Sequence, residues 1–142
     1  MSKTYISRKL RRQVEEDARY RCGYCLTMQL IIGRPFVMDH IIPEAKGGKT
    51  VRANLWLACR RCNEFKSVRT HFIDSLTNVL VPLFNPRTQS WNVHFAWSED
   101  GTQIIGLTAT GRATVAALRL NNAEIVGARS LWVSAGWHPP ND

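Results

Sequence analysis

The sequence of 142 residues contains no apolar run near the roughly 20 residues that a membrane-spanning helix needs. Its first residues, Met1–Ile6, also lack the apolar stretch of a secretory signal. These two absences exclude a membrane helix and lead us to expect a cytoplasmic protein. Because there is also no internal repeat and no low-complexity segment, the length predicts one small domain, or one small domain with an extension.

Acidic residues are few in the first half of the chain. Residues 1–70 hold 15 Lys and Arg against 6 Asp and Glu, a balance of +9. Residues 71–142 hold 4 against 5, a balance of −1, and the two halves together give the net charge of +8. A concentrated positive charge favours nucleic acid as the partner, because phosphates supply non-specific affinity. A basic surface without a partner is the alternative.

Cysteine is scarce as well, and all four cysteines belong to two Cys-x-x-Cys pairs, Cys22/Cys25 and Cys59/Cys62. In a cytoplasmic protein such pairs favour a metal over disulfides. Four thiolates are the ligands of a closed tetrahedral Zn²⁺ site, which leaves no position for water and therefore stabilises the fold without catalysing a reaction. An iron–sulfur cluster and a redox dithiol are the alternatives.

The segments around the cysteine pairs predict two helices and a hairpin. Residues 8–20 follow a possible N-cap at Ser7 and carry an apolar residue at every fourth position, which predicts a helix with one buried face. Met28–Ile32 and Phe36–Ile42 are rich in β-prone residues and are joined by glycine and proline, which predicts a β-hairpin. A second helix is expected over residues 62–76.

Residues 77–142 contain no recognisable catalytic motif. The two prolines of Thr77–Pro86 predict a linker laid across the core, because each restricts the residue before it. Trp91–Trp97 places large apolar residues at alternate positions, which predicts a half-buried strand paired with Thr102–Leu107. Helical patterns follow over residues 110–120 and 123–135. This half therefore predicts an α+β extension that supports the core or forms a surface for a partner.

Asp39 and His40 lie side by side in the apolar run Val37–Ile42, between the two cysteine pairs. Histidine is the side chain most easily set up as a base near neutral pH, and an adjacent carboxylate can hold a divalent cation. Taken alone, His40 is equally well a structural histidine. Asn54 is alone a turn residue, and Asn63 alone a helix cap.

Together these residues resemble the HNH nuclease motif. The resemblance is carried by Asp39-His40-Ile41-Ile42-Pro43, a Gly-Gly loop, Asn54, and the segment Cys59–Lys66, and it covers roughly Cys22–Lys66. The last position of the motif is Asn63 and not histidine, and the family includes such versions.

The resemblance implies an α+β protein with a zinc-stabilised ββα-metal nuclease core at residues 1–76 and a C-terminal α+β extension at residues 77–142. It implies hydrolysis of phosphodiester bonds in DNA, most simply double-stranded DNA. The residue roles that it implies are His40 as general base, Asp39 and Asn63 as ligands of a catalytic Mg²⁺ or Mn²⁺ ion, and Asn54 as the residue that steadies the His40 loop.

Contacts to nucleic acid are expected from four basic side chains, Lys66, Arg60, Arg61 and Arg69. Lys66 lies one helical turn beyond Asn63 and could steady the phosphate, although by itself it would be a solvated lysine. The alternative function is a zinc-knot module that binds nucleic acid without cutting it.

Overall fold

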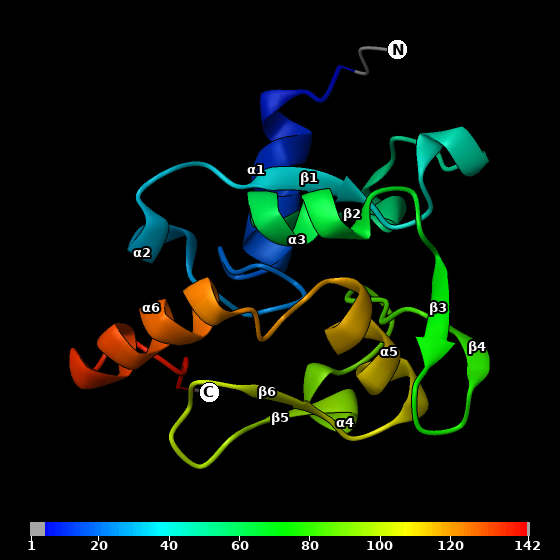
Figure 1. Cartoon of the computed structure of the whole chain (residues 1–142). Helices are drawn as coiled ribbons and strands as arrows, with labels where there is room; N and C mark the ends of the chain where they lie inside the picture. Colours follow the sequence, from blue (N-terminus) through cyan, green and yellow to red (C-terminus); the bar gives the residue numbers. More distant parts are fainter. Residues whose placement is uncertain (1–4, 142) are drawn as a thin grey trace.

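The chain forms three two-stranded antiparallel sheets with helices packed around them (Figure 1) in a computed structural model that describes residues 5–141. The first part contains α1 (Arg8–Asp17), α2 (Gln29–Ile32), β1 (Val37–His40), the 3₁₀ helices η1 (Glu44–Lys46) and η2 (Arg52–Asn54), β2 (Leu55–Ala58) and α3 (Arg60–Lys66). The second part contains β3 (His71–Asp74), β4 (Val79–Pro82), α4 (Trp91–His94), β5 (Phe95–Trp97), β6 (Ile104–Gly106), α5 (Ala109–Ala117) and α6 (Ala123–Ser134).

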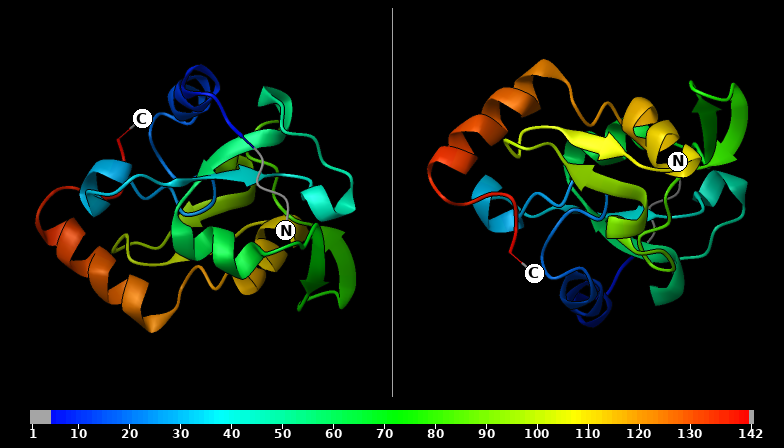
Figure 2. Two further views of the ribbon diagram at one scale, coloured as in Figure 1. Left: turned by 90° about the horizontal axis from the view of Figure 1, so that it is seen from above. Right: turned by 90° about the horizontal axis from the view of Figure 1, so that it is seen from below.

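These elements are stacked in two layers. Seen from above, β1 and α3 lie in front, and seen from below, β5 and β6 do (Figure 2). The β3–β4 hairpin stands at one end of both layers. No helix within residues 5–141 is long and apolar enough to cross a membrane.

Helix α1 begins where the sequence predicts it to begin. The Ser7 side chain accepts a hydrogen bond from the Leu10 N–H at 3.1 Å, so Ser7 is the N-cap. The helix ends earlier than expected, because Arg19 and Tyr20 both take left-handed backbone conformations with φ of 55° and 58°. Its apolar face is buried through Val14 and Ala18.

The hairpin predicted within residues 28–42 is wrong. Gln29–Ile32 forms the single turn α2, which ends at Gly33 in a left-handed conformation. The strand β1 pairs instead with β2, so that His40 lies opposite Leu55. The first segment was β-prone but lost the partner strand to a more buried competitor, since Leu30 is 82% exposed whereas Leu55 is fully buried.

The helix predicted over residues 62–76 is also wrong in its extent. It covers Arg60–Lys66 and ends at Ser67, which has a positive φ of 52°. His71–Asp74 then pairs with Val79–Pro82 as a hairpin, so half of the expected linker is a strand. The domain boundary expected between residues 76 and 77 therefore falls in the turn of this hairpin.

The strand predicted over Trp91–Trp97 is half helical. Residues 91–94 form the helical turn α4, and only Phe95–Trp97 is a strand, which pairs with Ile104–Gly106 as expected. In the helical turn, His94 directs its Nδ1 to Thr108 Oγ1 at 2.7 Å and packs against Phe84, so the exposed strand position expected for His94 is wrong. The helices predicted over 110–120 and 123–135 are confirmed as α5 and α6.

Both parts of the chain share one hydrophobic core. A single cluster of buried residues includes Cys22, Tyr24, Phe36, Leu57, Phe84, Phe95, Ile104 and Leu118. Two polar contacts also join the parts.

The first is made by Arg87, which bonds Asp17 on α1 at 2.9 Å and the Leu55 carbonyl at 3.1 Å while it lies over the Trp56 ring. The second is the Trp91 indole N–H, which donates to the Tyr24 carbonyl at 2.9 Å. The extension is thus packed directly on the core.

Candidate active site and metal centre

The four cysteine sulfurs come together in the interior. All four Sγ atoms lie within 4.8 Å of one another, and their residues are at most 7% exposed. The Sγ atoms of Cys25 and Cys59 are 3.8 Å apart. Sulfurs that surround Zn²⁺ tetrahedrally at about 2.3 Å are about 3.8 Å from each other, so this arrangement fits zinc. The cluster forms a closed metal site in which no ligand position is left for a substrate.

Local structure brings the sulfurs to one point. In the first pair, the Leu26 N–H donates to the Cys22 carbonyl, and Leu26 takes a left-handed conformation that closes the turn. In the second pair, Cys59 is the N-cap of α3, and its Sγ accepts a hydrogen bond from the Cys62 N–H at 3.4 Å. Hydrogen bonds from neighbouring thiols lower the pKa of Cys25, which favours the thiolate that a metal requires.

Asp39 is buried beside the sulfur cluster. It is 2% exposed, and both carboxylate oxygens have a donor: the Tyr24 hydroxyl at 2.6 Å from Oδ2 and the Lys66 ammonium at 3.2 Å from Oδ1. Burial raises the pKa of Asp39, and the charge of Lys66 opposes part of that rise. Tyr24 keeps its proton for this contact, because burial raises the pKa of the phenol.

Lys66 does not lie where the sequence led us to expect it. Its side chain is 2% exposed, and its ammonium donates to Asp39 Oδ1 and to the backbone carbonyls of His40 and Ile41. All three donor positions of the ammonium are used inside the protein. The expected contact of Lys66 with a phosphate is therefore wrong for this structure, and the ammonium instead joins α3 to the end of β1.

His40 stands at the C-terminal end of β1, with its side chain 16% exposed. Its Nε2 lies 2.8 Å from Thr50 Oγ1 and 3.7 Å from Glu44 Oε1. Both neighbours come from the loop that follows β1. They hold the imidazole in one orientation at the surface, where it can reach water.

The loop over residues 41–54 is closed by Asn54. Its amide oxygen accepts the Ile42 N–H, and its amide nitrogen donates to the carbonyls of Ile42 and Lys49, each at 2.9 Å. Gly48 lies inside this closure, and a Cβ there would be 1.6 Å from the Ile42 carbonyl oxygen. Only glycine allows so close an approach of the two backbone segments.

Comparison with protein families identifies this part of the chain. The family model described as HNH endonuclease matches residues 22–69. Residues 22–69 are an HNH domain. The match begins at Cys22 and contains all four cysteines, β1, β2 and α3. Comparisons with curated proteins and with solved structures found no match.

Within the HNH domain, Asp39, His40 and Lys66 are in mutual contact, and Asn54 holds the loop that begins after His40. Asn63 lies one turn before Lys66 on α3, partly buried, and its side-chain amide has no hydrogen-bond partner within residues 5–141. The zinc-type cluster and the His40 loop therefore flank the same short helix.

Three arginines of the HNH domain were expected to contact nucleic acid. Arg60 and Arg69 are exposed, and Arg69 also donates to the Phe65 carbonyl. Arg61 is only partly exposed, and its Nε is buried without a hydrogen-bond partner. Arg61 thus differs from the other two in that it faces inward as well as outward.

The sequence did not point to two residues of the site. Thr50 orients His40 but belongs to a polar loop without a pattern, so only its place in that loop could have drawn attention to it. Tyr24, which holds Asp39, could have been noticed as an aromatic residue inside a Cys-x-x-Cys turn.

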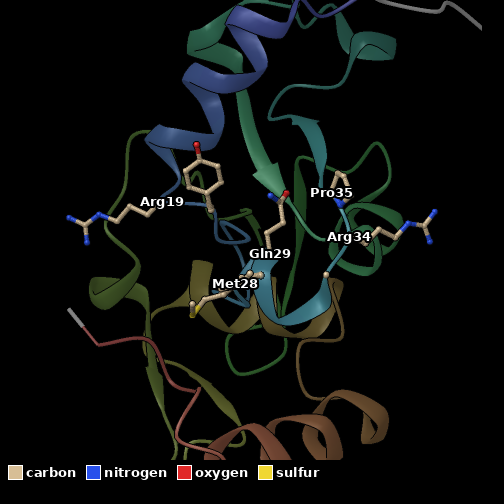
Figure 3. Close-up of a pocket in the computed structure, with 8 residues that line it drawn as sticks. Arg19, Met28, Gln29, Arg34 and Pro35 are labelled. Atoms are coloured by element: carbon tan, nitrogen blue, oxygen red, sulfur yellow. The ribbon is translucent and has the colours of Figure 1, made fainter.

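The hollows of the surface differ in their relation to this site. A pocket of about 590 Å³ lies between the end of α1 and α2, with Arg19 and Arg34 extending from its two sides (Figure 3). It lies at the end of β1 remote from His40. A smaller pocket of about 300 Å³ adjoins the His40 end, and it is lined by Ile41, Ile42, Lys66, Thr70, Pro82, Leu83, Phe84, Asn85, Thr88 and Gln89. This second pocket joins the HNH domain to the extension.

Proposed function

We propose that this chain is a metal-dependent endonuclease that hydrolyses phosphodiester bonds in DNA, with His40 as the general base. The observation that carries the proposal is the position of His40 in the HNH domain. The ring is accessible at the end of β1, it is oriented by Thr50, and its loop is closed by Asn54. A base that activates water needs this combination of access and fixed direction.

The residues assigned to the catalytic cation are Asp39 and Asn63. Carboxylate and amide oxygens suit a hard cation such as Mg²⁺ or Mn²⁺, which would neutralise the charge that develops on the phosphate. Lys66 lies against Asp39 Oδ1, so the cation would have to replace its ammonium there. Asn54 would act through the backbone that it binds, without touching the substrate.

Double-stranded DNA is the substrate that we propose. The first 70 residues carry a balance of +9, and the exposed side chains of Arg60 and Arg69 lie on α3 and directly after it. Positive side chains at this place would hold phosphates near His40. One site would cut one strand, so a double-strand break would need two molecules or two events.

One observation favours the alternative, a zinc-containing module that binds nucleic acid without cutting it. Asp39 is buried, and Lys66 already supplies it with a positive charge. A binding module would need nothing more at this position.

The experiment that separates the two functions uses supercoiled plasmid with Mg²⁺ or Mn²⁺ and a matched pair of variants. His40→Ala removes the proposed base, whereas His71→Ala removes an exposed histidine on β3. We expect nicking by the wild type and by His71→Ala, and a loss of at least about 100-fold in His40→Ala. Equal cleavage by both variants would contradict the role of His40, and binding without cleavage in either metal would establish the alternative.

A further inference from the structure

Arg129 on α6 is completely buried, although arginine remains charged in proteins. Its Nη1 donates to the Thr102 carbonyl at 2.9 Å and to Asn121 Oδ1 at 3.3 Å. Its Nε and Nη2 have no hydrogen-bond partner, and the guanidinium lies 5.4 Å from the centre of a Trp97 ring. Two of the three nitrogens of a buried cation are thus left without an acceptor.

Such an arrangement needs a negative charge nearby. Removing a charged group from water is expensive unless an opposite charge compensates it. Among the residues that the structure describes, no carboxylate forms an ion pair with Arg129. The negative groups that act on Arg129 are the thiolates of Cys25, Cys62 and Cys59, and they oppose the effect of burial on its pKa.

Arg61 repeats the same pattern from the other side. It lies on α3 between Cys59 and Cys62, and its Nε is buried without a partner. The cysteine thiolates raise its pKa against the opposing effect of burial, which is the largest single influence. The charges of Arg61 and Arg129 also repel each other, which indicates that both guanidiniums are directed to the same place.

We propose that Arg129 and Arg61 are the outer-shell counter-charges of the zinc site. Four thiolates around one Zn²⁺ leave a net charge of 2− in the interior, and two guanidiniums neutralise it. The unpartnered N–H groups are then directed at ligand sulfurs, which are acceptors when they are thiolates. Helix α6, which lies outside the HNH domain, becomes a working part of its metal site.

This proposal concerns zinc retention and holds whether or not the chain cuts nucleic acid. The test measures zinc release from the zinc-loaded protein to an excess of a chromogenic chelator. We expect Arg129→Met to release zinc about 10–100-fold faster, the range found when outer-shell partners of a metal site are removed. Arg129→Lys keeps the charge and is expected to lie closer to the wild type.

A second readout is the visible spectrum of the Co²⁺-loaded protein. Without the nearby positive charge, the thiolates hold their electrons less tightly, so the sulfur-to-cobalt bands of Arg129→Met are expected at longer wavelength. Arg112→Met is the matched control, because it removes an extension arginine that pairs with Asp74. We expect it to leave both readouts unchanged.

The proposal is overturned if Arg129→Met releases zinc at the wild-type rate, or if Arg112→Met accelerates release as strongly. Should Arg129→Met not fold, Arg61→Met takes its place, because the Arg61 side chain is partly exposed and the substitution is milder. An unchanged release rate in Arg61→Met would then overturn it.

Discussion

The buried ion pair between Lys66 and Asp39 allows a test that distinguishes the structure from the sequence-based expectation. The substitution is Lys66→Met, which keeps a flexible side chain of similar length and removes the ammonium. In the structure this leaves the Asp39 carboxylate buried at 2% exposure with Tyr24 as its remaining partner. If Lys66 were instead a surface residue waiting for a phosphate, its loss would hardly affect folding.

The expected magnitude follows from the burial of both partners. Removal of one partner from a buried ion pair costs about 3–5 kcal/mol. The carbonyls of His40 and Ile41 also lose their donor, which places Lys66→Met toward the upper end of this range. For a chain of this length, at about 4 °C per kcal/mol, the melting temperature should fall by roughly 12–20 °C.

The assay is urea unfolding of zinc-loaded protein, followed by tryptophan fluorescence. Arg69→Met is the control, because Arg69 lies just after the same helix, is exposed, and should cost less than about 1 kcal/mol. The double variant Lys66→Met/Asp39→Leu should recover part of the loss, because it no longer buries an unpaired charge. A loss below about 1 kcal/mol in Lys66→Met would refute the buried pair.

Three further predictions concern other parts of the molecule. Gly48→Ala places a methyl group 1.6 Å from the Ile42 carbonyl oxygen, so unfolding by urea should show a loss of about 1–3 kcal/mol or more. The Arg112 guanidinium holds the pKa of Asp74 well below its usual range, so Asp74→Asn should lower the melting temperature at pH 7. That difference should shrink below about pH 4, where the unfolded chain takes up the proton first. Burial lowers the pKa of His138 to about 4, so the unfolded chain binds a proton between pH 6.5 and 4 that the folded chain does not. Calorimetry should show wild-type stability falling as the pH drops through this window, and His138→Phe should flatten that dependence.

The sequence predicts the local parts of this molecule well. The Ser7 cap, the two cysteine turns, and the order of Asp39 and His40 depend on residues that are close in the chain, so spacing alone reveals them. The family match over residues 22–69 agrees with that reading. Each of these features is decided within one or two turns of backbone.

What the sequence predicts poorly depends on contacts between distant segments. Met28–Ile32 and Leu55–Ala58 are both β-prone, and burial in the folded chain decides which of them pairs with β1. Lys66 has the spacing of a surface lysine, and only the three-dimensional packing shows that its ammonium is enclosed. Arg129 has no motif at all, because its significance comes from cysteines about 70 and 100 residues earlier in the chain.

Tyr24 gives the fold a further property through its two ends. Its carbonyl accepts the Trp91 indole N–H from the extension, and its hydroxyl donates to Asp39. One rigid aromatic residue, fixed between two cysteines, therefore spans the distance from α4 to the carboxylate beside His40. Because the emission of an indole depends on its hydrogen bond and its surroundings, Trp91 is a built-in optical probe of whatever displaces Asp39. A cation or a nucleic acid arriving at that carboxylate can be followed without any added label.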